Sequence, residues 1–94
     1  MRKTKIIVTI GPSSRDPEML EKLITKGIDC ARLNFSHGTL EEHAEVIGNI
    51  REISEKHGRH VAILQDLGGI KLRLGYLPEP VVLHPGDVVA LVPQ

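Results

Sequence analysis

The chain has 94 residues with 12 basic and 12 acidic side chains, so its formal charge at pH 7 is zero. This balance gives no basic surface for nucleic acid or for a membrane, and the only aromatic residues, Phe35 and Tyr76, provide no platform on which bases could stack. The single Cys30 excludes an internal disulfide and favours a reducing compartment. No apolar run is long enough for a signal peptide or a membrane span, so we expect a cytoplasmic protein.

The first elements expected in the chain are a strand and an amphipathic helix. Residues 5–10 form a nearly continuous β-branched run, which is typical of a strand covered on both faces in a parallel sheet. Asp16 suits the N-cap of a helix, Pro17 suits its first position, and Gly27 suits the position after Lys26. We therefore predict a helix from Pro17 to Lys26.

The next elements repeat this order. A second strand is predicted at about residues 28–35, and a second helix starts at Thr39, which can form a capping box with Glu42. The pair His57-Gly58 ends that helix, and residues 61–66 form a third apolar strand. Two successive strand–helix–strand units predict a parallel sheet with right-handed crossovers.

The pattern changes after the third strand. Residues 67–75 alternate apolar and basic side chains after a glycine pair, and residues 81–92 have the pattern of an antiparallel hairpin with its turn at residues 84–87. We place a domain boundary near Tyr76, so that residues 1–75 form one α/β unit and residues 76–94 begin a small β-rich unit. Three parallel strands leave two sheet edges open, and the sequence offers no cover for them, so we expect the beginning of a larger α/β barrel.

Polar side chains gather where the predicted strands end, and the ends of parallel strands meet at one edge of a sheet. Arg32 has a planar fork of donors that suits phosphate or carboxylate. A cation would suit the hard oxygens of Asn34, Ser36 and Asp66. Further on, Lys71 and Arg73 can point the same way and add positive charge for a polyphosphate.

Plainer readings stay open for each of these residues. Arg32 could simply pair with Asp66, and Asn34 and Ser36 could be turn residues that cap the following helix. His37 is either a loop residue or a catalytic base. The other histidines lack the spacing of metal ligands and are expected at the surface; they are His43, His57, His60 and His84.

Three segments carry a resemblance to a known family. Residues 9–14 (TIGPSS), 31–38 (ARLNFSHG) and 66–75 (DLGGIKLRLG) resemble the first three signature segments of the pyruvate kinase family, in that family's order and at its spacing. The resemblance extends over essentially the whole chain, and the segment 31–38 is its most specific part.

The resemblance implies a fold and a reaction. It implies the first three βα units of a TIM (β/α)8 barrel, followed by the start of a small β-rich lid domain. It also implies a glycolytic phosphotransferase that moves the phosphoryl group of phosphoenolpyruvate to ADP, giving pyruvate and ATP, with Mg²⁺ and a monovalent cation such as K⁺ as cofactors. The full-length form would be a homo-oligomer without nucleic-acid or membrane partners.

The resemblance also implies roles for individual residues. Arg32 matches the arginine that contacts the transferred phosphoryl group, and Arg73 matches a contact to the nucleotide phosphates. The monovalent cation would be bound by Asn34, Ser36, Asp66 and the backbone carbonyl of Leu67. The nucleotide side would consist of Pro12, Asn34, Phe35, Ser36 and His37.

Two positions depart from the family pattern. Ile70 replaces a usual proline, and Lys71 replaces the glutamate of potassium-dependent members, so that its ammonium could stand in for K⁺. The family's catalytic lysine and its Mg²⁺ ligands come from later strands, and we therefore expect this chain alone to be inactive. The alternatives are a non-catalytic phospholigand-binding or assembly module and a non-functional truncated fragment.

Overall fold

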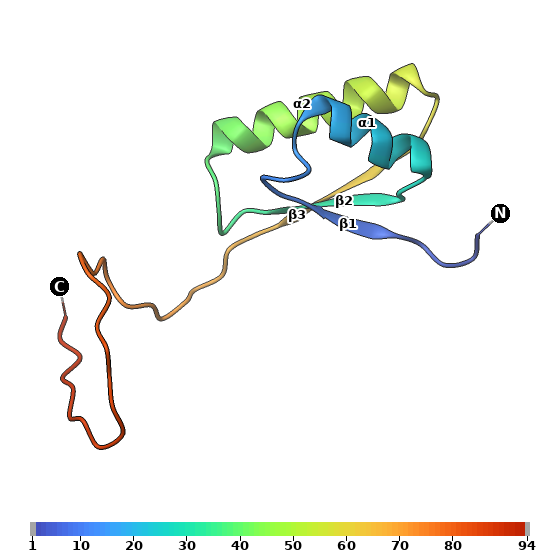
Figure 1. The fold of residues 1–94 in the computed structure, drawn as a ribbon. Coiled ribbons are helices and arrows are strands. Elements are labelled where there is room, and N and C mark those ends of the chain that lie inside the picture. The colour runs from blue at the N-terminus through green and yellow to red at the C-terminus, as the bar shows by residue number, and fades with distance from the viewer. Residues whose placement is uncertain (1, 94) are drawn as a thin grey trace.

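A computed structural model describes residues 2–93 and shows three strands that alternate with two helices (Figure 1). In chain order the elements are β1 (Ile7–Ile10), α1 (Pro17–Lys26), β2 (Cys30–Asn34), α2 (Leu40–Lys56) and β3 (Ala62–Asp66). The strands form one parallel sheet in the order β1-β2-β3. The predicted parallel α/β architecture is therefore confirmed.

Local side-chain chemistry sets the ends of both helices. The Asp16 carboxylate accepts hydrogen bonds from two backbone N–H groups of the first turn of α1, and Gly27 ends that helix in the left-handed region with φ of 97°. At the start of α2, Thr39 and Glu42 form the predicted capping box in both directions. Gly58, with φ of 58°, follows its last turn. All four helix ends agree with the prediction.

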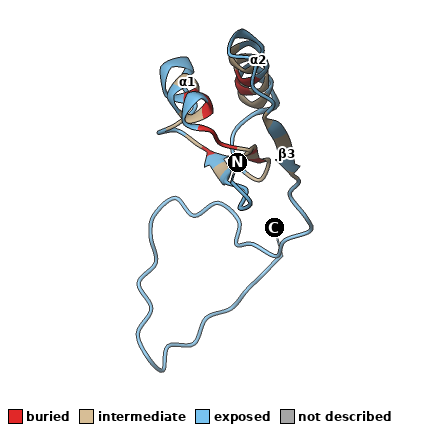
Figure 2. Ribbon diagram, turned by 90° about the vertical axis from the view of Figure 1, so that its right-hand side faces the viewer, coloured by how far each residue is buried: buried red, intermediate tan, exposed pale blue. Residues whose placement is uncertain are grey.

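Both helices lie on the same face of the sheet, and the core fills the space between these two layers (Figures 1 and 2). The alternation along β2 shows this division, because Ala31 and Leu33 are buried against the helices while Arg32 points to the other face. The buried core consists of Ile10, Leu20, Ile24, Ile28, Ala31, Leu33, Val46 and Ile50.

The other face of the sheet is open. Ile7 in β1 is 60% exposed, so the expectation that residues 5–10 are covered on both faces is wrong for this structure. The physical reason is that both described helices pack on one face, and the chain after β3 runs away from the sheet (Figure 1). None of the helices within residues 2–93 is both long and apolar enough to cross a membrane.

Residues 67–93 contain no helix or strand and are exposed throughout. The prediction of a paired hairpin over 81–92 is therefore wrong, although its turn forms: the Asp87 N–H donates to the His84 carbonyl at 3.1 Å, and Gly86 has φ of 93°. An isolated two-stranded hairpin is marginal in water without a packing partner, and every residue from 81 to 92 is exposed. The division into residues 1–75 and 76–94 stays a prediction.

Candidate functional site

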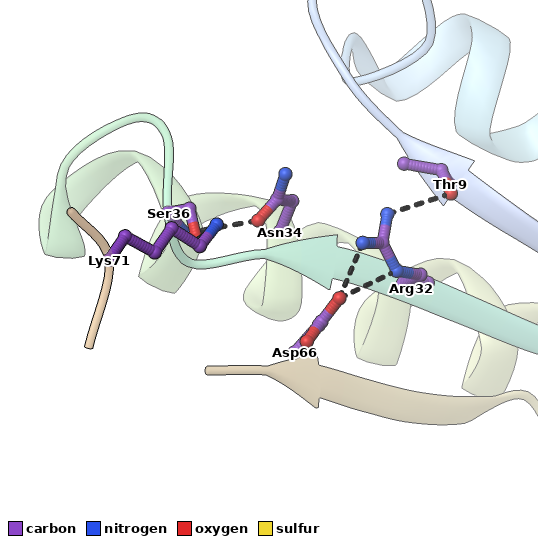
Figure 3. Close-up of polar contacts among 6 residues, drawn as sticks. All are labelled: Thr9, Arg32, Asn34, Ser36, Asp66 and Lys71. Carbon is purple, nitrogen blue, oxygen red and sulfur yellow. Dashed lines mark hydrogen bonds and ion pairs between the residues drawn. The ribbon is translucent and has the colours of Figure 1, made fainter. Parts of the chain in front are cut away.

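The candidate site lies at the carboxyl ends of the three strands, on the open face of the sheet. The strand register places Thr9 beside Arg32 and Asn34 beside Asp66. Polar residues from three segments that are far apart in sequence therefore lie next to one another, as Figure 3 shows.

Arg32 spans all three strands with its guanidinium group (Figure 3). Its Nε donates to Asp66 Oδ2 at 3.0 Å, Nη2 donates to the same oxygen, and Nη1 donates to Thr9 Oγ1 at 3.2 Å. The plainer reading, in which Arg32 pairs with Asp66, is therefore realised. Arginine has five N–H donors and these contacts use three, which leaves one hydrogen on each terminal nitrogen for a further acceptor. The Arg32 side chain is 32% exposed, so an anion can reach it.

Asn34 and Ser36 shape the turn that follows β2. Asn34 Oδ1 accepts a hydrogen bond from the Ser36 N–H at 3.0 Å, so the alternative reading is right about the turn. It is wrong about the cap, because Thr39 and not Asn34 or Ser36 caps α2. A backbone hydrogen bond of 2.9 Å from the Phe35 N–H to the Asp66 carbonyl ties this turn to the end of β3.

Lys71 reaches back to the same turn, where its Nζ donates to Ser36 Oγ at 3.2 Å (Figure 3). The chain approaches the turn closely just before this lysine, because a Cβ added at Gly68 would lie 3.2 Å from Ser36 Oγ. Only glycine leaves this oxygen undisturbed. An ammonium group thus contacts one of the oxygens that the sequence assigns to a monovalent cation.

The oxygens assigned to the cation fit such an ion in kind, since they are a carboxylate, an amide oxygen and a hydroxyl. Each already has a protein donor: Asp66 has Arg32, Asn34 has the Ser36 N–H, and Ser36 has Lys71. Within the described residues, no three histidine, cysteine, aspartate or glutamate side chains come together as a metal cluster.

A cavity of about 360 Å³ lies beside these residues, between the loop after β1 and the start of α2. Three residues assigned to the nucleotide side line it, namely Pro12, Asn34 and His37. Arg73 does not reach it; this residue lies in the exposed segment after β3, where it lines a separate hollow formed by residues 72–77 and 90–92. Phe35 does not line the cavity either.

Among the lining residues that were not predicted as site residues, Arg15, Glu42 and His43 are the ones with ionisable side chains. Arg15 Nη1 contacts Glu42 Oε1 at 3.2 Å and so joins the two walls of the cavity. The hydrogen bond from the Thr39 N–H, followed by that from Arg15, holds the pKa of Glu42 below its usual value, so this carboxylate is charged at neutral pH. His43 was expected at the surface; it is half-buried there and also lines the cavity. The sequence signal that could have identified His43 is its position four residues after the N-cap Thr39, in the first turn of the helix that follows the site.

Comparisons with known proteins agree with this geometry. A family model described as pyruvate kinase, barrel domain, matches residues 1–92. A pyruvate kinase of Thermococcus litoralis is 53% identical over 90 residues, which cover 95% of this chain and 19% of that protein. One from Chlamydia trachomatis is 49% identical over 90 residues, covering 96% of this chain and 19% of the relative.

A solved structure gives the same result for the fold. The crystal structure of Cryptosporidium parvum pyruvate kinase superposes with a TM-score of 0.66 at 49% identity, covering 70% of this chain and 14% of that one. The chain thus spans about a fifth of the length of the curated relatives that it matches. With strands, helices and sequence all in agreement, this chain belongs to the pyruvate kinase family and represents part of that family's barrel domain.

Proposed function

We propose that this chain contributes the first part of the active site of a pyruvate kinase, which in its full-length form transfers the phosphoryl group of phosphoenolpyruvate to ADP in glycolysis. The single observation that carries this proposal is the position of Arg32 at the strand ends. Two of its N–H groups are left for an acceptor. Thr9, to which Arg32 donates, lines a cavity together with Pro12, Asn34 and His37.

The residues of this chain would act by position and charge. Phosphoryl transfer depends largely on holding the reactants in line and on stabilising the negative charge that spreads over the transferred group. Arg32 would bind oxygens of that group, because Asp66 and Thr9 fix the plane of its guanidinium. The cavity would take the nucleotide, and Arg73 would contact its phosphates once the segment after β3 is held against the barrel.

The cofactors are part of the same proposal. Mg²⁺, when bound, would neutralise the phosphate charges, and we assign its ligands to parts of the full-length protein beyond this chain. For the monovalent cation, the oxygens of Asn34, Ser36, Asp66 and the Leu67 carbonyl would form the site. The contact of Lys71 with Ser36 supports the proposal that its ammonium takes over this role, so that added K⁺ is not required.

The remaining features complete the proposed protein. Residues 1–75 would belong to a (β/α)8 barrel and residues 76–94 would begin its lid domain, in a cytoplasmic homo-oligomer. The test is a coupled assay of pyruvate formation with the full-length protein, phosphoenolpyruvate, ADP and Mg²⁺. Turnover that is lost with Arg32→Ala supports the proposal, while a folded full-length protein without turnover would refute it.

A further inference from the structure

The turn that follows β2 is held by a side chain from the next helix. His43 lies in the first turn of α2, and its Nε2 is 2.7 Å from the carbonyl oxygen of His37. A carbonyl can only accept a hydrogen bond, so the Nε2 of His43 is the donor. The imidazole therefore carries a proton on Nε2 and fixes the backbone at His37.

The same imidazole holds the turn at a second point. The ring of Phe35 stacks on the ring of His43, with centroids 4.2 Å apart and an angle of 14° between the planes. Stacked aromatic pairs contribute to stability beyond the area that they bury. His43 thus contacts the turn on both sides of Ser36, through Phe35 and through His37.

The backbone of the turn rests directly on the start of α2. Gly38 has φ of 76°, and a Cβ at that position would lie 3.3 Å from the Nε2 of His43 and 3.1 Å from Oε2 of Glu42. A side chain at residue 38 would therefore crowd both Glu42 and His43. Loss of the hydrogen bond from His43 would release the backbone carbonyl of His37.

This restraint matters because His37 and His43 both line the cavity, together with Pro12. We propose that His43 is a positioning residue for the nucleotide: by holding His37 and Phe35, it fixes the wall of the cavity against which a nucleoside diphosphate binds. This inference rests on the proposed function, since ADP is the ligand of that reaction.

Two substitutions separate the contacts that His43 makes. In His43→Phe the ring stack with Phe35 is kept and the donor to His37 is lost. In His43→Gln the ring is lost, but an N–H donor is kept at the distance of Nε2 along the side chain. His57→Phe is the matched control, because His57 ends the same helix and contacts Glu21 rather than the cavity.

The measurements are steady-state kinetics of the full-length protein and hydrogen exchange of the backbone at residues 35–38. One lost neutral hydrogen bond corresponds to a change of about fivefold. We therefore expect His43→Phe to raise the KM for ADP about fivefold and to speed exchange in the turn, with the KM for phosphoenolpyruvate and the thermal midpoint unchanged. His43→Gln should restore the KM for ADP to within about twofold of the parent, and His57→Phe should change neither readout.

The possible results distinguish this inference from the proposed function. An unchanged KM for ADP together with unchanged exchange in His43→Phe would overturn the inference, as would a parallel rise in both Michaelis constants that His43→Gln does not reverse. If the parent protein does not bind ADP at all, the proposed function fails, and the exchange data alone then decide whether His43 holds the turn. If His43→Phe does not fold, His43→Leu also lacks the donor and replaces it.

Discussion

Replacing Arg32 by lysine is the sharpest test of the candidate site, because it keeps the charge and removes the fork. Arg32 uses three donors on Asp66 and Thr9 and keeps two for a ligand. A lysine has three donors on one atom, which cannot bind Asp66 and two phosphoryl oxygens with the same geometry. One or two charge-assisted hydrogen bonds to the transferred group are lost, at roughly 1.5 to 3 kcal/mol each.

A loss of about 2.7 kcal/mol in transition-state binding corresponds to about a hundredfold lower kcat/KM. The effect on folding should be far smaller, because the pair of Arg32 and Asp66 is partly exposed and such pairs contribute about 1 kcal/mol or less. The assay is coupled detection of pyruvate with the full-length protein, alongside a thermal melt. Arg59→Lys is the control, because Arg59 contacts the Thr25 carbonyl away from the site. A kcat/KM of Arg32→Lys within threefold of the parent would show that this arginine is only structural.

The other predictions concern the cation, the helices and the isolated chain. Full-length protein should show no specific activation by KCl at constant ionic strength, whereas Lys71→Glu should make activity depend on K⁺. Strong K⁺ activation of the parent would refute the proposal that the Lys71 ammonium takes the place of K⁺. Thr39→Ala should lower the free energy of unfolding by about 1 kcal/mol in a denaturant titration, because the cap of α2 is lost, and Thr39→Ser should restore most of it. The hydrogen bond from Lys56 and then that from His57 lower the pKa of Glu21 in the folded state below its usual 4.5. The stability that ionised Glu21 contributes is therefore complete above pH 4.5 and is lost as the pH falls through the lowered pKa. Glu21→Gln should consequently make the free energy of unfolding fall less steeply at acid pH. An unchanged acid dependence would contradict this. Finally, the 94 residues alone should form no pyruvate from phosphoenolpyruvate and ADP, and hydrogen exchange should show fast opening at the two sheet edges; Mg²⁺-dependent turnover that elutes with the monomer would refute this expectation.

The features that sequence analysis predicted well are those decided by near neighbours in the chain. The caps at Asp16, Gly27 and Thr39 depend on contacts within a few residues, and all of them form. Side chains alternate along a strand, and Arg32 accordingly lies on the face of β2 opposite Ala31 and Leu33. The pairing of Arg32 with Asp66, which the sequence left open as one alternative, requires only that the strands be parallel and in sequence order.

The features that were missed depend on distant parts of the chain. Glu42 was identified only as a capping residue, because its contact with Arg15 joins the loop after β1 to the first turn of α2, and these become neighbours only when the helices pack. The hairpin prediction was wrong for a related reason. The alternation over residues 81–92 indicates a strand with one apolar face that must pack on another surface, and the sequence pattern does not show whether such a surface is present. The resemblance of residues 66–75 predicted that Arg73 contacts the nucleotide phosphates. That contact requires another part of the protein to hold this exposed segment in place.

The capping box at the start of α2 has a consequence for how this region can change by mutation. One oxygen of the Glu42 carboxylate accepts from the Thr39 N–H and the other accepts from Arg15. Glutamine has a single acceptor oxygen, so it could serve the helix or the loop after β1 but not both. Substitutions at Arg15 and Thr39 are therefore expected to show epistasis through a residue that neither of them replaces. Glu42 should tolerate fewer exchanges than its partial exposure alone would suggest.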